Sequence, residues 1–321
     1  MQPSKDRKKC KKTLYNFSVL KYNADIKANQ NGKERNVMKK LFASILAILM
    51  ILSCFAGCAN QDPTPTNPAT NAPTDGATDA PTQEPKVITV GYTLYAPMNF
   101  QDENGELIGF DTDLTKAVFE ALGYKVIFQE IDWNQRYTDL ESGAIDCIWN
   151  GFTCNTADDD GVLRADKVDF SYNYMENRQV IVAKKDSGIA AAADLAGKLA
   201  AVESGSAGET YAKTFEGASV KGFLKQTDAL FEVNAGTADF AVLDAQLAKS
   251  YAGKGDYADL VIIENLSSDV EYYAVGFKKG SELTAQVNAQ FEALAADGTI
   301  AQLAETYGVS NTAITDFSDQ K

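Results

Sequence analysis

From residue 87 onward, short apolar segments alternate with segments whose apolar residues recur every three or four positions. Residues 87–91 are the first apolar segment and predict a strand. Leu114, Val118 and Ala121 then follow helical spacing, which predicts a helix with one buried face. Strands and helices in alternation imply a mostly parallel sheet covered on both faces, so the pattern predicts an α/β fold.

The alternation continues to about residue 307. Further strands are predicted at residues 124–131, 145–149, 179–183, 198–202, 219–223, 240–243, 260–263 and 272–277. Further helices are predicted at residues 134–142, 207–215, 228–235, 245–251, 282–296 and 300–307. Asp111 or Thr112 is expected to cap the first helix, and Gly123 to end it.

Residues 38–57, ahead of this part, have the three zones of an export signal. Lys39 and Lys40 form a basic start, an apolar stretch follows, and small residues precede Cys58. The sequence Phe-Ala-Gly-Cys at 55–58 resembles the bacterial lipobox, whose cysteine is lipidated and becomes the new N-terminus. Cys54 is the competing acceptor. An uncleaved membrane helix is the other alternative, which the shortness of the apolar run disfavours.

The segments on either side of this signal lack the pattern of a folded domain. Residues 1–37 are basic and patternless, and we interpret them as a non-native extension before a start at Met38. Residues 58–86 hold almost no large apolar side chain and many Pro and Thr, which predicts a lipid anchor followed by a disordered linker.

The net charge limits the classes of partner. The whole chain carries −14, and because residues 1–58 contribute +9, the remainder carries −23. Nucleic acids and anionic lipid head groups need clustered Lys and Arg, so we expect neither to bind the globular part.

Residue usage also limits the chemistry. The chain contains no histidine, which removes the commonest general base and metal ligand, so we expect no metal and no cofactor. Cys147 and Cys154 are the two cysteines beyond Cys58. A bridge between them is possible, but two buried or neutral thiols are the favoured interpretation.

In open α/β sheets the ligand binds beyond the carboxyl ends of the strands, so the loops after the strands are the candidates for a site. Several of these loops resemble the amino-acid-binding proteins of ATP-driven importers. The matching segments are Tyr-Ala-Pro at 95–97, Gly-Glu-Leu-Ile-Gly-Phe-Asp-Thr-Asp-Leu at 105–114, Trp133, residues 140–146 and Arg-Ala-Asp-Lys-Val-Asp-Phe-Ser at 164–171. The resemblance covers about residues 87–307.

The resemblance implies a type II periplasmic-binding-protein-like fold. Two α/β lobes, each with a central sheet, would be joined by two crossover strands, near residues 179–184 and 270–273. Lobe 1 would comprise residues 87–182 and 272–321, and lobe 2 residues 183–271. A ligand would bind in the cleft between the lobes.

The resemblance also implies a clamp for a zwitterion. Arg164 matches the family's arginine for the ligand's α-carboxylate, a role that suits the rigid two-pronged guanidinium. Asp244 matches the acid that pairs with the α-ammonium. The alternatives are a surface arginine that pairs with Asp166 or Asp169, and an aspartate that caps the helix at residues 245–251.

The remaining family positions fall on three groups of residues. The loop residues Asn150, Gly151 and Thr153 would hydrogen-bond the carboxylate, and Ser206, Ala207 and Gly208 would place a helix N-terminus toward an anionic group. The aromatic walls of the side-chain pocket would be Tyr95, Trp133 and Phe152. A place in the core is the alternative for each of these aromatic residues, and for Phe152 it is as strong as the pocket; the polar residues at 132, 134 and 135 weaken it for Trp133.

Two features depart from the family pattern. Eleven positions separate Thr153 from Arg164, where about five are usual, and the insertion contains three consecutive aspartates at 158–160. It could displace Arg164 or form a lip over the cleft. Glu203 adds a negative charge to the expected pocket, while Tyr92 replaces an aspartate of cation-selective members. We hypothesise that Glu203 favours polar or cationic amino acids; a solvent-facing glutamate is the alternative.

The expected function is that of a lipid-anchored, monomeric receptor on the extracellular face of the membrane. It would capture a free amino acid, deliver it to an ABC permease, and catalyse no reaction. The alternatives are a cleft enzyme of the cyclohexadienyl or arogenate dehydratase type, for which Glu203 could donate a proton, and a sensor or adhesin on the same fold.

Overall fold

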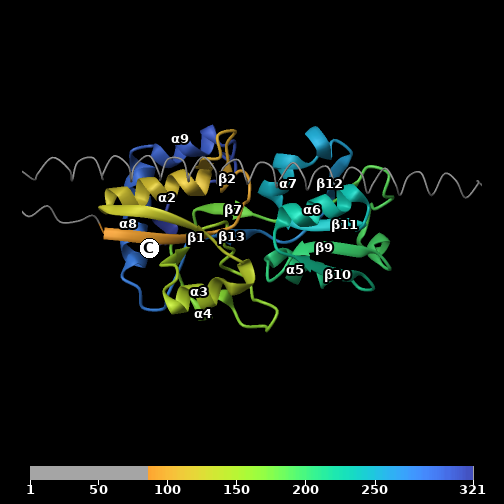
Figure 1. Ribbon diagram of the computed structural model, residues 1–321, viewed down its shortest axis with the longest axis horizontal. Coiled ribbons are helices and arrows are strands. Elements are labelled where there is room, and N and C mark those ends of the chain that lie inside the picture. The colour runs from red at the N-terminus through yellow and green to blue at the C-terminus, as the bar shows by residue number, and fades with distance from the viewer. Residues whose placement is uncertain (1–85, 321) are drawn as a thin grey trace, which may run out of the picture. The chain divides into compact units, whose positions relative to one another are not determined.

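The computed structural model describes residues 86–320, all of which belong to one unit, Asp79–Lys321 (Figure 1). The predicted extension, signal, linker and lipid acceptor, at residues 1–85, lie outside the described residues. Among residues 86–320, no helix is both long enough and apolar enough to cross a bilayer.

The first lobe is built on a five-stranded sheet of order β4-β1-β5-β14-β6. Its strands are β1 (Lys86–Tyr92), β4 (Tyr124–Glu130), β5 (Cys147–Ile148), β6 (Asp169–Phe170) and β14 (Gly276–Phe277). Strand β1 runs parallel to β4 and β5, whereas β14 is antiparallel to β5 and β6. Chain from both ends of the described segment therefore completes this lobe.

The second lobe has a sheet of order β10-β9-β11-β8-β12. Its strands are β8 (Gln179–Lys184), β9 (Leu199–Glu203), β10 (Ser219–Phe223), β11 (Phe240–Asp244) and β12 (Leu260–Ser267). Strands β10, β9 and β11 are parallel, and β8 is antiparallel to β11 and β12. The predicted two-lobed α/β fold is confirmed, with sheets that are mixed rather than mostly parallel.

Helices cover both sheets, and short 3₁₀ turns and a small hairpin complete the lobes. The helices are α2 (Phe110–Ala121), α3 (Arg136–Ser142), α4 (Arg164–Lys167), α5 (Ala207–Ala212), α6 (Gln226–Ala235), α7 (Ala245–Tyr251), α8 (Leu283–Ala296) and α9 (Thr299–Thr306). The turns are η1 (Trp133–Gln135), η2 (Ala192–Leu195), η3 (Gly255–Tyr257) and η4 (Ser318–Gln320), and the hairpin strands are β2 (Phe100–Gln101) and β3 (Leu107–Ile108). Helices α2, α8 and α9 lie on the first lobe, and α5, α6 and α7 on the second (Figure 1).

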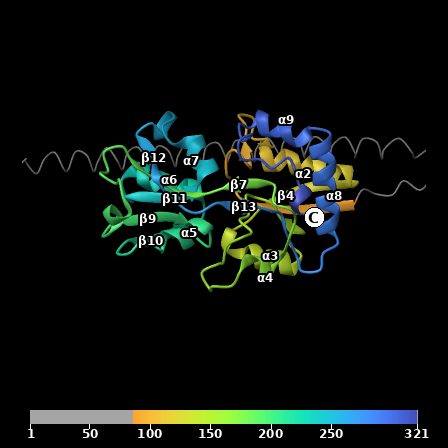
Figure 2. The ribbon, with the colours of Figure 1, turned by 180° about the vertical axis from the view of Figure 1, so that it is seen from behind.

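Two antiparallel strands, β7 (Met175–Asn177) and β13 (Glu271–Tyr273), run between the lobes, as the view from behind also shows (Figure 2). The second crossover lies where the sequence predicted it. The first does not: residues 179–184 pair with β11 and β12 inside the second sheet. Because residues 179–183 are buried, this apolar segment is a central strand, and residues 179–182, expected in lobe 1, pair within lobe 2.

Helix α2 presents the predicted apolar face to the core, where Leu114 and Val118 are fully buried. Gly123 follows the helix with a left-handed φ of 80°, as predicted. The predicted cap is wrong, because the helix begins at Phe110 and Asp111 lies within its first turn. The buried Asp111 carboxylate instead accepts hydrogen bonds from the Gly151 backbone N–H at 2.8 Å and the Tyr174 hydroxyl at 2.9 Å.

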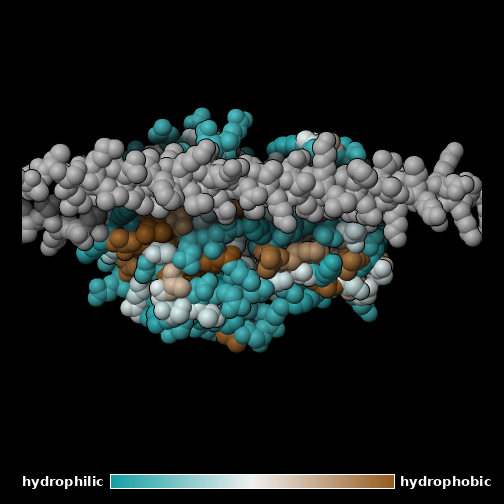
Figure 3. All heavy atoms as spheres, in the orientation of Figure 1, coloured by the Kyte–Doolittle hydropathy of each residue, from teal (hydrophilic) through white to brown (hydrophobic). Residues whose placement is uncertain are grey.

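The visible face of the globular part is mostly hydrophilic, with apolar side chains gathered in separate small patches (Figure 3). The large apolar residues that are exposed on the described part of the chain are Val87, Ile127, Val162, Leu163, Leu224 and Phe231. Scattered residues of this kind are normal on a protein surface.

Gly109 fixes the start of α2 and, through Asp111, the position of the Gly151 loop. Its φ is 131°, and an added Cβ would lie 2.0 Å from the Met98 carbonyl oxygen. We expect Gly109→Ala to lower the free energy of unfolding by about 3 kcal/mol or more, measured by urea denaturation. Gly105→Ala is the matched control, because Gly105 also has a positive φ but an added Cβ there would meet no atom within 4 Å. This variant should lose only about 1 kcal/mol of unfolding free energy. Equal losses would contradict the steric explanation.

Candidate functional site

A cleft between the lobes brings together residues at or shortly after the carboxyl ends of five strands, β4, β5, β9, β10 and β11, with Arg164 at the start of α4. Its lining consists of Trp133, Asn150, Gly151, Thr153, Arg164, Glu203, Ser206, Ala207, Gln226 and Asp244. The lobes approach closely here, because Arg164 Nη2 donates to the Gly205 carbonyl oxygen across the cleft at 3.4 Å. At the outer end of the same face, the Lys225 ammonium of lobe 2 pairs with Glu130 of lobe 1.

Nine of the twelve ligand-binding positions predicted from the sequence line this cleft, and Tyr95, Phe152 and Gly208 do not. The Tyr95 hydroxyl lies 2.6 Å from that of Tyr273, beneath the lining. Phe152 is fully buried and packs on Trp133 and Phe170, with ring centroids 5.2 and 4.9 Å away, so its alternative place in the core is correct. Gly208 packs closely against the second sheet: an added Cβ would lie 2.9 Å from the Val242 carbonyl oxygen.

Arg164 is the cationic centre of the lobe 1 side. Its side chain is 1% exposed, its Nε donates to Asp158 Oδ1 at 2.8 Å, and its Nη1 donates to the Thr153 carbonyl oxygen at 3.2 Å. The alternative of a surface arginine that pairs with Asp166 or Asp169 is therefore wrong. The insertion has not displaced Arg164 from the cleft; it supplies the counterion of this arginine.

Asp158 accepts four hydrogen bonds from side chains around it. Besides Arg164, the donors are Arg136 Nη2 and the Tyr137 hydroxyl, both at 2.7 Å, and Lys167 Nζ at 2.9 Å. Burial alone would raise the pKa of Asp158, but the Arg164 and Arg136 guanidinium groups outweigh it and hold the pKa at about 2. The carboxylate is thus ionised at any physiological pH.

Arg136 is a second buried cation that the sequence prediction missed. Its guanidinium lies 4.4 to 5.6 Å from the ring centroids of Tyr137, Trp133 and Phe152. Burial, and then the charge of Arg164, lowers its pKa. Trp133 packs against Arg136 and Phe152, both of lobe 1, and only 5% of its surface is exposed.

Asp244 is the anionic centre of the lobe 2 side. Helix α7 begins directly after it, yet its carboxylate makes no capping bond, so the alternative of a helix cap is wrong. Asp244 Oδ1 accepts from Asn177 Nδ2 and Gln179 Nε2, both at 2.6 Å, and Oδ2 accepts from Gln226 Nε2. Burial raises its pKa.

Glu271, on the crossover strand β13, shares two of these donors. Its Oε1 accepts from Asn177 Nδ2 at 2.5 Å and from Gln179 Nε2 at 2.7 Å. Burial, and then the charge of Asp244, raises the pKa of Glu271 to about 7. Two buried carboxyl groups thus share the same amides, a pair that a cation would stabilise.

Glu203 ends β9 and is 4% exposed, so the alternative of a solvent-facing glutamate is wrong. Its Oε1 is buried and has no hydrogen-bond partner among residues 86–320. Burial, and then the charge of Asp244, raises the pKa of Glu203 to about 8. Tyr92 packs on Phe128 at a centroid distance of 6.1 Å and does not line the cleft.

The carboxylate-binding loop is held from behind by lobe 1. Asn150 Nδ2 donates to the Thr93 carbonyl oxygen and to Asn99 Oδ1, at 2.8 and 2.7 Å. Because the Gly151 N–H already donates to Asp111, this predicted backbone donor is engaged inside the lobe. On the opposite lobe, Ser206 caps α5 by accepting from the Glu209 N–H at 3.1 Å.

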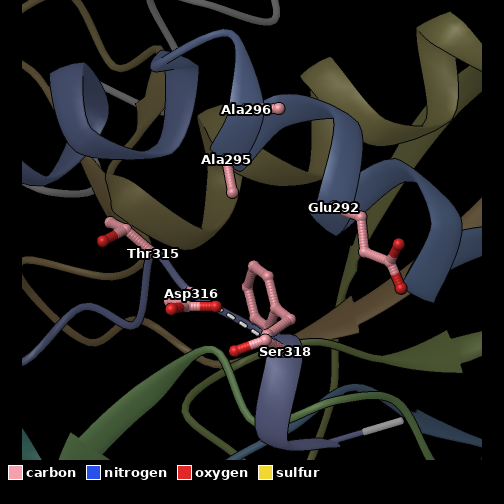
Figure 4. A pocket seen from close by; sticks show the side chains of 7 residues that line it. Glu292, Ala295, Ala296, Thr315, Asp316 and Ser318 are labelled. Atoms are coloured by element: carbon pink, nitrogen blue, oxygen red, sulfur yellow. Dashed lines mark hydrogen bonds between the residues drawn. The ribbon is translucent and has the colours of Figure 1, made fainter.

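Among residues 86–320, no group of His, Cys, Asp and Glu side chains could hold a metal ion. Cys147 and Cys154 are free thiols, and burial raises the pKa of both, that of Cys154 to about 11. The two cysteines are unbridged, in agreement with the favoured interpretation of two buried or neutral thiols. A further hollow lies on lobe 1, away from the cleft, where the C-terminal residues Thr315, Asp316 and Ser318 face Glu292 and Ala295 of α8 (Figure 4).

Two lobes of this topology, with a cleft at the carboxyl ends of parallel strands, define the class of type II periplasmic binding proteins. The chain belongs to the bacterial extracellular solute-binding proteins, family 3, whose family model matches residues 88–310. This family and its curated relatives are amino-acid-binding proteins of ABC importers.

The individual relatives differ in the ligand that their names state. The chain is 29% identical over 212 residues to the arginine-binding extracellular protein ArtP of Bacillus subtilis, an alignment that covers 65% of this chain and 80% of ArtP. It is 28% identical over 274 residues to the L-cystine-binding protein TcyA of the same organism, covering 84% and 97%. A solved ancestral arginine-binding protein with bound arginine superposes with a TM-score of 0.63 at 34% identity, covering 69% of this chain and 97% of that one.

The buried carboxyl groups predict how stability depends on pH. The folded protein retains the proton of Glu203 up to about pH 8, whereas the unfolded chain releases it near 4.5. The free energy of unfolding should therefore fall as the pH rises between these values. Glu203→Gln should remove the part of this decrease in unfolding free energy that Glu203 causes. The variant should be more stable than the parent at pH 8 by a few kcal/mol, as measured by urea denaturation from pH 5 to 9. The exposed Glu264→Gln is the control and should leave the slope unchanged. If Glu203→Gln keeps the parent's slope of unfolding free energy against pH, other groups cause the pH dependence.

Proposed function

We propose that this protein is a lipid-anchored extracellular receptor that closes on one free amino acid, with polar or cationic ones favoured, and delivers it to an ABC permease without catalysing a reaction. The observation that carries the proposal is the pairing of opposite charges across one cleft. Arg164 lies on lobe 1, and Asp244 lies on lobe 2.

The two charges suit the two ends of an amino acid. A carboxylate that enters from the cleft would meet the terminal nitrogens of Arg164 beside Thr153. An ammonium group would meet Asp244, behind which Glu271 adds a second carboxyl group. Since one partner comes from each lobe, the ligand stabilises the closed arrangement.

The ligand's side chain would extend toward Glu203 and Trp133. Glu203 Oε1 is a buried oxygen that has no donor among residues 86–320, which costs free energy that a guanidinium, ammonium or amide group of the ligand would recover. A cation would also favour the ionised form of Glu203, so its binding should release a proton near neutral pH. This carboxyl group supports a preference for polar or cationic side chains over apolar ones.

The family and the sequence support the proposed delivery and location. Curated relatives are extracellular binding proteins of ABC transporters, which supports a permease as the partner. The signal-like segment and Cys58 support an anchor in the outer leaflet of the cell membrane. The charge of −23 that remains when the +9 of residues 1–58 is subtracted from −14 supports a receptor that acts as a monomer and binds no nucleic acid.

A cleft enzyme of the dehydratase type is the second candidate, and Glu203 is the observation that favours it. A carboxyl group whose pKa is raised to about 8 carries a proton at neutral pH, as a general acid must. Turnover of arogenate or prephenate by the purified protein, with no thermal stabilisation by any free amino acid, would reverse the order of the two candidates.

The first test is a calorimetric comparison of L-arginine and L-glutamine. We expect both to bind the parent protein and arginine to bind more tightly. Glu203→Gln should weaken arginine by about tenfold or more and change glutamine by less than threefold, because only arginine loses a charged partner. The control is Glu264→Gln, an exposed substitution on lobe 2 that should change neither affinity. An unchanged ratio of the two affinities would remove Glu203 from the ligand site.

The anchor has a separate test in the full-length chain. Cys58→Ser should release a folded, ligand-binding protein into the medium, because the chain then lacks its lipid attachment. Immunoblots of membrane and medium fractions measure this, with Cys54→Ser as the matched control. Retention of Cys58→Ser on the membrane, together with release of Cys54→Ser, would move the acceptor to Cys54.

A further inference from the structure

We propose that Asp158, within the insertion at residues 154–163, is a positioning residue for the ligand's α-carboxylate. It occupies one edge of the Arg164 guanidinium and thereby presents the other edge to the cleft. This inference rests on the proposed function of the cleft as an amino-acid site.

The hydrogen bonds of Arg164 define which donors remain for a ligand. A guanidinium has five N–H donors. Asp158 takes Nε at 2.8 Å, the Thr153 carbonyl takes one N–H of Nη1 at 3.2 Å, and the Gly205 carbonyl takes one of Nη2 at 3.4 Å. Within the described part of the chain, one N–H on each terminal nitrogen is left, and a carboxylate is best bound by two such donors in one plane.

Asp158 is itself fixed by the backbone of the insertion. Its N–H donates to the Val162 carbonyl oxygen at 3.0 Å, and its carbonyl oxygen accepts from the Gly161 N–H at 2.9 Å. The Arg164 N–H donates to the Thr156 carbonyl oxygen at 3.0 Å, which closes the loop at its base. The inserted residues thus form a compact turn that holds the carboxylate in one place.

The charge of Asp158 is as important as its geometry. Arg136 and Arg164 are both buried, with side chains 4% and 1% exposed, and Asp158 Oδ1 accepts from both of them. Without this anion, two like charges would face each other away from water, and the Arg164 side chain would turn away from its neighbour. The orientation of Arg164 therefore depends on an acid of the segment at residues 154–163.

The following residue connects the same turn to lobe 2. Asp159 accepts from the Thr210 hydroxyl of α5 and pairs with Lys213, the residue that follows this helix. The side chains of Asp159 and Lys213 are 42% and 46% exposed, so their ion pair contributes little to the free energy of unfolding. It offers a matched control, since Asp159 contacts the opposite lobe but not Arg164.

The experiment uses calorimetry with two pairs of probes: L-arginine with L-argininamide, and L-glutamine with its α-amide. Each pair differs only in the α-carboxylate, and the pH is chosen so that both α-amines are charged. The parent should prefer each acid to its amide. Asp158→Asn should weaken the acids by about tenfold or more and the amides by less than threefold, so the preference should fall by a similar factor.

The controls separate positioning from general stability. Asp159→Asn and Asp160→Asn change neighbouring aspartates of the same turn, and each should leave the acid-to-amide preference unchanged. Asp160 also bonds Lys167, at 2.8 Å, but does not contact Arg164. If Asp158→Asn does not fold, Asp158→Glu retains the charge and displaces it by one methylene; it should also lower the preference.

Several outcomes would overturn the proposal. Equal weakening of acids and amides by Asp158→Asn would reduce Asp158 to a structural role. If Asp158→Asn binds the acids more tightly than the parent does, Asp158 competes with the ligand for Arg164 and is not a positioning residue. Failure of the parent protein to bind either acid would instead contradict the proposed function, and with it this inference.

Discussion

The structure of the cleft depends on charges that are buried on facing surfaces of two lobes. Removing an ionised group from water costs several kcal/mol unless partners replace the lost hydration. Arg164 has Asp158 and the Thr153 carbonyl of its own lobe and the Gly205 carbonyl of lobe 2 as partners, and Asp244 has three side-chain amides, one of them from the connecting strand β7. The two sites differ in how their charge is balanced. Arg164 is neutralised by Asp158 of its own lobe, whereas Asp244 and Glu271 accept from side-chain amides, which carry no charge.

This asymmetry links the site to the connection between the lobes. Asn177 and Glu271 come from β7 and β13, the strands that run between the lobes, and both contact the group around Asp244. Any rotation of one lobe against the other would act on the same two strands. The two buried acids are therefore bonded directly to the strands that connect the lobes.

Periodicity was sufficient to predict most strands and helices, because each buries one face whose spacing is visible locally. It also predicted the strand at residues 179–183 correctly, whereas the crossover that the family resemblance implied there was wrong, because only the pairing partners distinguish a crossover from a central strand. Asp111 was expected to cap a helix because the local sequence favours it, but its partners Gly151 and Tyr174 lie 40 and 63 positions away.

The candidate site shows the same limit. Residues on loops that follow strands could be located, whereas Arg136, Gln226 and Glu271 could not, since each acts on a residue that is distant in sequence. One signal was available: three aspartates in an insertion next to a buried arginine imply a counterion.

The two tryptophans of the chain lie in contrasting surroundings. Trp149 is sealed in lobe 1 among Phe119, Tyr174 and Phe291, while Trp133 lines the cleft beside Arg136. Indole emission is sensitive to water and to nearby charge, so one fluorophore senses the cleft and the other supplies a constant background. The protein thus carries an intrinsic optical reporter of cleft opening that requires no label.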